Sequence, residues 1–173
     1  MKSTSYQLSI IMMAILAVCL PACGPSTTTE AVDVELKLSG DMLFEGANSL
    51  QYSNESQLEE LAAAVGSDIR SIKNVSVSAA LLELDNSSRQ ITESLLLQIV
   101  SDNQELVSIG TLNPLPKSDQ LKLSIAEDSS ILPYLKDSGM TWVLNLNISE
   151  DYMDEMLVKG KLSLTIEYVP SNN

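Results

Sequence analysis

Carboxylate side chains are the groups in this sequence best suited to chemistry. Their densest cluster consists of Glu150, Asp151, Asp154 and Glu155, between two segments with a β-strand pattern. Because Ca²⁺ prefers several converging oxygen ligands, one interpretation is a calcium-binding loop. The cluster lacks the Asp-x-Asp-x-Asp-Gly spacing of such loops, and a solvated acidic loop is the simpler interpretation. These four residues are the one candidate for a metal site.

The absence of histidine excludes several catalytic classes. Among 173 residues there is no histidine, and the two cysteines are Cys19 and Cys23. Ser-His-Asp and Cys-His catalysis and imidazole metal sites are therefore excluded. The sequence also contains no Gly-x-Ser-x-Gly elbow, Ser-x-x-Lys dyad or glycine-rich phosphate loop. We predict a protein that is not an enzyme and needs no cofactor, with a carboxylate-based hydrolase as a distant alternative.

The charge of the chain limits its partners. It carries 23 acidic and 10 basic side chains, a formal charge of −13 and a pI near 4.2. Nucleic acid is excluded as a partner because its phosphates require a basic surface. Anionic lipid also attracts basic rather than acidic surfaces, so the folded part should not lie flat on a membrane.

Residues 1–22 have the pattern of an export signal. Lys2 supplies a positive start, and residues 8–20 form an apolar run interrupted only by Ser9. This run is too short for a comfortable permanent span, which needs about 20 apolar residues. It is typical of the hydrophobic region of a signal peptide.

The end of this segment, Leu20-Pro21-Ala22-Cys23, resembles the lipobox of bacterial lipoproteins, although Pro21 replaces the commoner Ala or Ser. The resemblance implies lipidation of Cys23 through a diacylglyceryl thioether, cleavage just before it, and acylation of the new N-terminus, for example with palmitate. Gly24 in place of Asp implies transfer to the outer membrane. The alternative is ordinary secretion with cleavage after Ala22, which would leave an unpaired thiol in an exported protein.

The pattern of the remaining residues predicts one mainly β domain at residues 32–169. Residues 23–31, which precede it, are expected to form a lipidated N-terminus and a flexible tether. Apolar and polar residues alternate with period two, as in antiparallel sheets with one wet face. Few helical segments interrupt these strands, which favours an antiparallel β-sandwich with one or two short helices. The clearest alternating segments are residues 32–39, 121–125, 142–148 and 161–168.

Two middle segments predict finer features of the sheet. In residues 75–84 the apolar residues move from odd to even positions, which indicates a β-bulge or a strand that changes sheets. Residues 95–100 are apolar on both faces except for Gln98, which favours a central strand. Residues 102–104 should then turn the chain into a hairpin strand at 105–110.

Two short helices are expected. Residues 57–65 contain good helix formers, Ser56 and Glu59 match a capping box, and Gly66 should end the helix. The second lies within residues 130–136, where Pro133 is tolerable only in the first turn.

The aromatic residues bear on ligand binding. Trp142 and Tyr168 lie on the apolar phase of their strands and should pack in the core, whereas Tyr152 and Tyr52 could be exposed. We predict a membrane-anchored lipoprotein of the bacterial envelope, a non-enzymatic binding or structural module for a protein or polymer partner. A small-ligand or carbohydrate-binding β-sandwich is the alternative, with Tyr152 as its stacking residue.

Overall fold

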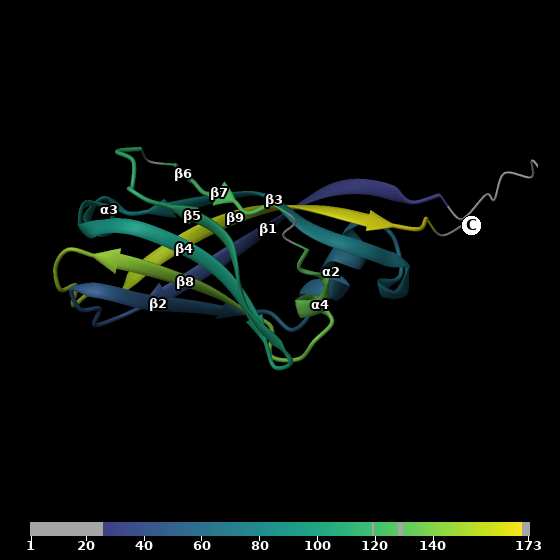
Figure 1. Ribbon diagram of the computed structural model, residues 1–173, viewed down its shortest axis with the longest axis horizontal. Coiled ribbons are helices and arrows are strands. Elements are labelled where there is room, and N and C mark those ends of the chain that lie inside the picture. The colour runs from purple at the N-terminus through teal and green to yellow at the C-terminus, as the bar shows by residue number, and fades with distance from the viewer. Residues whose placement is uncertain (1–25, 119, 128–129, 171–173) are drawn as a thin grey trace, which may run out of the picture.

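A computed structural model describes residues 26–118, 120–127 and 130–170 of the chain. As predicted, the protein is mainly β, and its paired strands are antiparallel (Figure 1). The strands are β1 (Thr28–Gly40), β2 (Gly46–Ser53), β3 (Ile72–Leu84), β4 (Thr92–Ser101), β5 (Gln104–Leu112), β6 (Leu121–Lys122), β7 (Ser124–Ile125), β8 (Thr141–Ile148) and β9 (Met156–Tyr168). The helices are α2 (Gln57–Ala64), η1 (Ile69–Ser71), α3 (Asn86–Ile91) and α4 (Leu132–Leu135).

The sheet nearly closes on itself. Its strand order is β6-β3-β9-β1-β2-β8-β4-β5-β7, and the two end strands, β6 and β7, are consecutive pieces of one segment. This segment bridges the two ends of the sheet: the Leu123 N–H donates to the Ala80 carbonyl at 3.0 Å, and the Ala126 N–H donates to the Ile109 carbonyl at 2.9 Å. The expected single strand at 121–125 is therefore split into two short pieces, because its halves pair with opposite edges.

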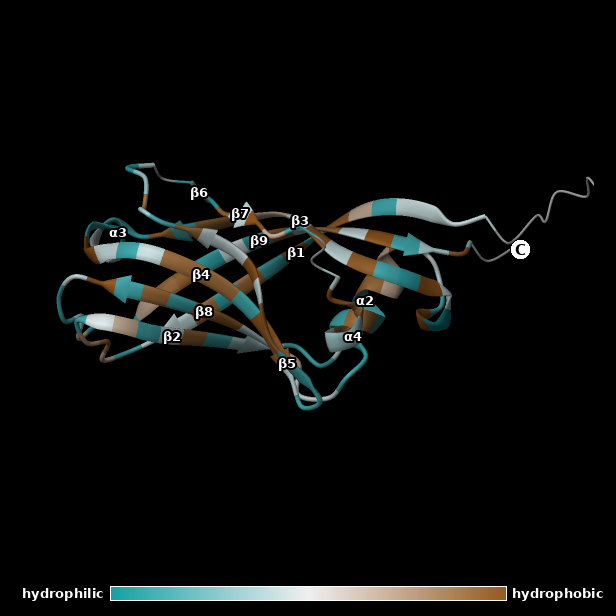
Figure 2. Cartoon of the chain, in the orientation of Figure 1, coloured by the Kyte–Doolittle hydropathy of each residue, from teal (hydrophilic) through white to brown (hydrophobic). Residues whose placement is uncertain are grey.

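The junction between β1 and β2 divides the sheet into two faces. These strands pair at Ser39 and Gln51, whereas β1 pairs with β9 along all 13 of its residues. The faces β3-β9-β1 and β2-β8-β4-β5 enclose a core of alternating apolar side chains, and the alternation is visible along the strands in Figure 2. Strand β4 lies between β8 and β5, which confirms the central position predicted for residues 95–100.

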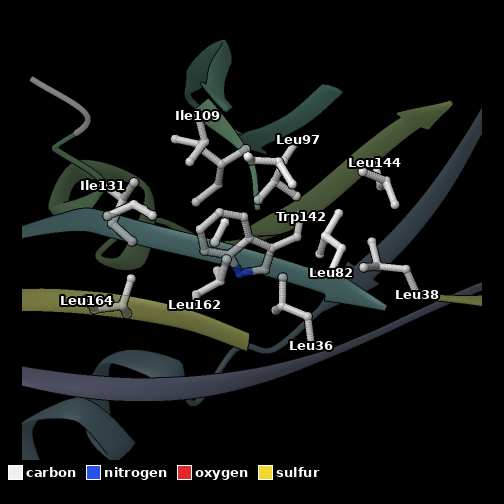
Figure 3. Close-up of a cluster of buried hydrophobic side chains, with 14 of the residues drawn as sticks. Leu36, Leu38, Leu82, Leu97, Ile109, Ile131, Trp142, Leu144, Leu162 and Leu164 are labelled. Carbon is white, nitrogen blue, oxygen red and sulfur yellow. The ribbon is translucent and has the colours of Figure 1, made fainter. Parts of the chain in front are cut away.

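Trp142 lies at the centre of the core. Its side chain is fully buried among residues from both faces, including Leu97, Ile109 and Leu162 (Figure 3). The indole N–H donates a 3.1 Å hydrogen bond to the Gln57 Oε1 of α2. Trp142 and Tyr168 are thus core residues, as predicted.

The predicted bulge occurs in β3. The pairing of β3 with β9 shifts register between Val77 and Ala79, and the buried positions move from Val77 to Ala80. The extra residue, Ser78, donates its hydroxyl hydrogen to the Ser163 carbonyl at 2.8 Å. The bulge explains why the apolar residues of this segment change from odd to even positions. One inserted residue moves every later side chain to the other face of the sheet.

Helix α2 ends as predicted, but its capping box does not form. Gly66, with φ of +62°, follows the helix. The Ser56 side chain makes no cap hydrogen bond to a backbone N–H; its hydroxyl instead donates to Asn54 Oδ1 and Glu60 Oε1. The backbone of Ser56, with φ of −94° and ψ of 6°, lies outside the extended conformation of a capping residue, so its hydroxyl oxygen is not placed to accept a backbone N–H of the first turn.

One other boundary and two whole elements differ from the prediction, whereas the second expected helix forms. Strand β1 begins at Thr28, inside the expected tether, because residues 28–31 pair with residues 165–168 of β9. Helix α4 is a single turn within the expected residues 130–136, and Pro133 lies in its first turn as predicted. Strand β2 and helix α3 were not predicted, and their short, polar sequences carry little apolar periodicity.

We expect Asp85→Ala to lower the free energy of unfolding by about 1 kcal/mol. Asp85 caps α3: its carboxylate accepts the Ser88 N–H at 2.9 Å and the Ser88 hydroxyl hydrogen at 2.8 Å. Urea denaturation followed by circular dichroism measures the loss. Asp85→Asn should keep most of the stability, since asparagine also caps helices well; an equal loss in both variants would contradict the capping role.

We expect Asp137 to make the free energy of unfolding fall at acid pH. Its carboxylate accepts hydrogen bonds from Asn103 Nδ2, the Ser101 hydroxyl and the Asn103 N–H at 2.7–2.8 Å. These bonds, that from the Asn103 side chain first, hold the pKa of Asp137 below its ordinary value. The stabilisation is therefore present above the ordinary value of about 4 and is lost as the pH falls through the lower folded pKa.

We expect Asp137→Asn to flatten the acid limb of the stability profile. The measurement is the unfolding free energy in urea between pH 2 and pH 6. Asp154→Asn controls for the loss of one charge, because the Asp154 carboxylate accepts no hydrogen bond in the described structure. Equal acid limbs in the wild type and Asp137→Asn would contradict the prediction.

Candidate binding site at the distal tip

Two loops meet at one end of the molecule: residues 41–45, between β1 and β2, and residues 149–155, between β8 and β9. We call these two loops together the distal tip. Leu43 and Tyr152 join them by an isolated antiparallel bridge, with N–H to carbonyl distances of 2.9 and 2.8 Å. The Tyr152 hydroxyl also lies 3.4 Å from the Ser87 hydroxyl of α3. The tip is therefore held by hydrogen bonds between three separate parts of the chain.

Large apolar side chains project from the distal tip into solvent. Met42 and Phe44 are each 62% exposed, and Met153 is 57% exposed. They flank the bridge residues Leu43, which is buried, and Tyr152, which is half-buried. Met42 has a φ of +50°, so the chain turns at this residue, and both Met42 and Phe44 are exposed on either side of the buried Leu43.

The backbone that carries Phe44 is fixed by Asn48. The Asn48 amide accepts the Phe44 N–H at 3.2 Å and donates to the carbonyls of Phe44 and Gly46 at 2.8 and 3.1 Å. The next N–H, of Glu45, donates to Asp151 Oδ1 at 2.8 Å. The exposed phenyl ring thus sits on a preorganised backbone.

Acidic residues surround these apolar side chains. The two loops contain no lysine or arginine. Within residues 26–118, 120–127 and 130–170, no three Asp, Glu or Cys residues lie close enough to hold a metal ion. The predicted calcium candidates Glu150, Asp151, Asp154 and Glu155 therefore do not converge, and the Asp151 carboxylate binds the Glu45 backbone instead. The exposed acids of the tip are Asp41, Glu45, Glu150, Asp151, Asp154 and Glu155.

The structure separates the two tyrosines expected at the surface. Tyr152 is half-buried in the distal tip, and Tyr52, also half-buried, lies on β2 beside α2. Neither is a fully exposed stacking platform. The sequence reasoning did not select Met42, Phe44 and Met153; the signal that could have found them is large apolar residues inside acidic loops.

The carboxyl groups with clearly shifted pKa values are ionised more readily than usual. The pKa of Asp33 is lowered by hydrogen bonds from Lys161 and Ser163, and that of Asp68 by hydrogen bonds from Arg70. Burial raises the pKa of Asp85, but hydrogen bonds from Ser87 and Ser88 outweigh it. A general acid in glycoside hydrolysis needs a raised pKa, the opposite of these shifts.

The distal tip lies at the far end of the molecule from the start of β1. Thr28, the first residue of β1, pairs with Tyr168 near the C-terminus, whereas Gly40 at its other end leads into the tip (Figure 1). The 13 residues of β1 span about 40 Å. Cys23 and the predicted export signal lie outside the described residues. Among the described residues, no helix is long and apolar enough to cross a membrane.

Comparisons with known proteins reveal no relative. No protein-family model matches the chain, and neither does any curated protein. Solved structures that align with this chain include Desmodium yellow mottle tymovirus, at 7% identity and a TM-score of 0.31 over 84% of this chain and 91% of that one. Turnip yellow mosaic virus has 10% identity and a TM-score of 0.31 over 87% and 86%. These scores support no conclusion about function.

Proposed function

We propose that this protein is a lipid-anchored binding module of the bacterial envelope, without enzymatic activity. Its anchor is a lipidated Cys23 in the outer membrane, and its binding site is the distal tip. The observation that carries the proposal is the pair of 62% exposed side chains, Met42 and Phe44, that flank the bridge residue Leu43. They lie at the end of the domain opposite the residues that follow the anchor.

Exposed apolar side chains of this size stabilise an interface when a partner covers them. Burying one methionine or phenylalanine contributes about 1.5–3 kcal/mol, and preorganised anchors lose little entropy on binding. Three such side chains, Met42, Phe44 and Met153, are gathered on one small surface. This is the arrangement of a binding hot spot, an apolar centre with a polar rim.

The acidic residues around the apolar side chains determine which kind of partner surface can bind. The tip has six exposed acids and no basic residue, so it repels anionic lipid and favours a protein with an apolar socket bordered by lysine or arginine. Charge complementarity of this kind accelerates association and is weakened by salt. We therefore expect binding to slow markedly between 50 and 500 mM salt.

The anchor is tested by intact-mass measurement of the protein purified from its native host. We expect the mass of a chain that begins at Cys23 and carries acyl groups, and we expect Cys23→Ser to release the protein from the membrane fraction. An unmodified thiol at Cys23 would falsify the lipidation, while leaving the proposal for the tip standing.

The distal tip is tested by site-specific photo-crosslinking in the native envelope, with the crosslinker at position 44 or 153. Leu106 of β5, which is 50% exposed, is the control position. We expect one crosslinked protein from the tip and none from position 106. With that partner purified, Phe44→Ala should weaken binding about 10- to 100-fold, and Leu106→Ala should leave it unchanged. Equal effects of the two substitutions would contradict the proposal.

A further inference from the structure

The edge of β1 that faces away from β9 is largely unpaired. In the described structure β1 meets β2 at Ser39 and Gln51, and its earlier residues have no strand on that side. Every second residue of an antiparallel strand directs its N–H and C=O toward the same neighbour. The open edge between Thr28 and Lys37 therefore presents backbone donors and acceptors that another strand can use.

A groove of about 310 Å³ runs along this edge, between β1 and helix α2. Val32, Val34 and Leu61 supply an apolar floor, and Tyr52 lines it where β2 ends. The groove opens because β2 leads into α2 and separates from β1 after its single pairing. Four consecutive residues of β1, residues 32–35, line the groove. Because their side chains point alternately to the two faces of the sheet, the groove must lie along the unpaired edge of β1.

One buried polar group at the groove lacks a partner. Gln57, which lines the groove, is 1% exposed; its Oε1 accepts the Trp142 indole N–H. Its Nε2 is buried without any hydrogen-bond partner among the described residues. An amide N–H₂ left unpaired in the interior is costly, and a carbonyl oxygen in the groove would satisfy it.

The charged residues of the groove are acidic. Asp33, Glu35 and Glu60 line it, and the groove lining contains no lysine or arginine. The nearby Lys161 ammonium pairs with Asp33 Oδ2 at 2.8 Å, outside the lining. Basic side chains beside Asp33 and Glu35 would therefore gain opposite-charge neighbours, which stabilise paired strands.

We infer that the groove between β1 and α2 binds an extended peptide segment of a partner protein that alternates apolar and basic residues. The segment adds a strand to the β1 edge, so its backbone supplies affinity and its side chains supply specificity. Its apolar residues rest on Val32, Val34 and Leu61, and its basic residues face Asp33 and Glu35. A second copy of this chain is disfavoured as the occupant, because antiparallel pairing of two β1 edges centred on Val34 in the groove would place Asp33 opposite Glu35 twice. This site is distinct from the distal tip.

The inference is tested by fluorescence anisotropy of labelled synthetic peptides with the mature protein. The alternating peptide Lys-Val-Lys-Val-Lys-Val is the probe. We expect it to bind at least about tenfold more tightly than its glutamate counterpart or the block peptide Lys-Lys-Lys-Val-Val-Val. N-methylation of alternate residues, in the register that faces β1, should abolish binding because it removes backbone donors. Unchanged affinity after N-methylation in both registers would overturn strand addition.

Helix α2 offers a matched pair of variants. Ala63 and Ala64 are both exposed, but only Ala64 lines the groove. Ala64→Arg fills the groove and adds a positive charge, and it should weaken peptide binding about tenfold or more; Ala63→Arg should change it less than twofold. Equal effects, or displacement of the peptide by the neutral oligosaccharide chitohexaose, would overturn the inference. Retained circular dichroism spectra show that both variants fold.

Discussion

Trp142→Ala is expected to lower the free energy of unfolding by about 3–5 kcal/mol. The indole is fully buried between the two faces of the sheet, so alanine leaves a cavity that the strands cannot close (Figure 3). Domains of this kind are stable by only about 5–15 kcal/mol. Urea denaturation must be followed by circular dichroism, because Trp142 is the sole tryptophan. A loss below about 1 kcal/mol would contradict its central role.

A second variant separates packing from hydrogen bonding. Trp142→Phe keeps most of the apolar contact but removes the indole N–H, which leaves both polar atoms of the Gln57 side chain unpaired. We expect a loss of about 1–3 kcal/mol from this buried group. Adding Gln57→Leu should recover part of the loss, because the leucine has no polar atom to satisfy. Additive effects in this double-mutant cycle would show that the two side chains are not coupled.

Gly160→Ala is expected to destabilise the protein by about 1–3 kcal/mol through overpacking. Gly160 of β9 lies directly between Leu36 of β1 and Leu82 of β3. A Cβ atom at Gly160 would lie 2.9 Å from Leu82 Cδ2 and 3.2 Å from Leu36 Cβ. The Leu36 Cβ cannot rotate away, because it is attached directly to the backbone. Glycine at this position therefore lets Leu36 and Leu82 pack closely on the two neighbouring strands.

Leu82→Val tests the mechanism, since valine lacks the terminal methyl group that the new Cβ would meet. Combined with Gly160→Ala, it should cost less than the sum of the two single changes. The measurement is the urea midpoint of both single variants and the double variant. A midpoint for Gly160→Ala equal to that of the wild type would contradict overpacking.

The strand pattern was largely readable in the sequence. Leu162, Leu164 and Ile166 of β9 alternate with polar residues, and all three are buried. The phase change in residues 75–84 likewise predicted the bulge between Val77 and Ala79. These predictions succeed because side chains alternate across a strand, so a one-sided core leaves a period of two in the chain.

The sequence was less informative where several local hydrogen-bonding arrangements compete. Ser56 and Glu59 match a capping box, yet the Ser56 hydroxyl donates to Asn54 and Glu60 instead. Helix α3 forms around Asp85 without an apolar pattern. Large apolar residues inside acidic loops could have pointed to Met42, Phe44 and Met153, but the two proposed binding surfaces as a whole were not predictable, because each combines residues that are distant in the chain.

By itself, the sequence determined the mainly β class, the core strands and the absence of histidine chemistry, because composition and side-chain alternation are properties of the chain. It also carries the pattern of an export signal and a lipidated cysteine. Only the tertiary structure decided that residues 41–45 meet residues 149–155, which gathers Met42, Phe44 and Met153 on one acidic tip. Only the tertiary structure left the β1 edge open beside α2. Both surfaces depend on which strands become neighbours, and long-range pairing leaves no local signal in either strand.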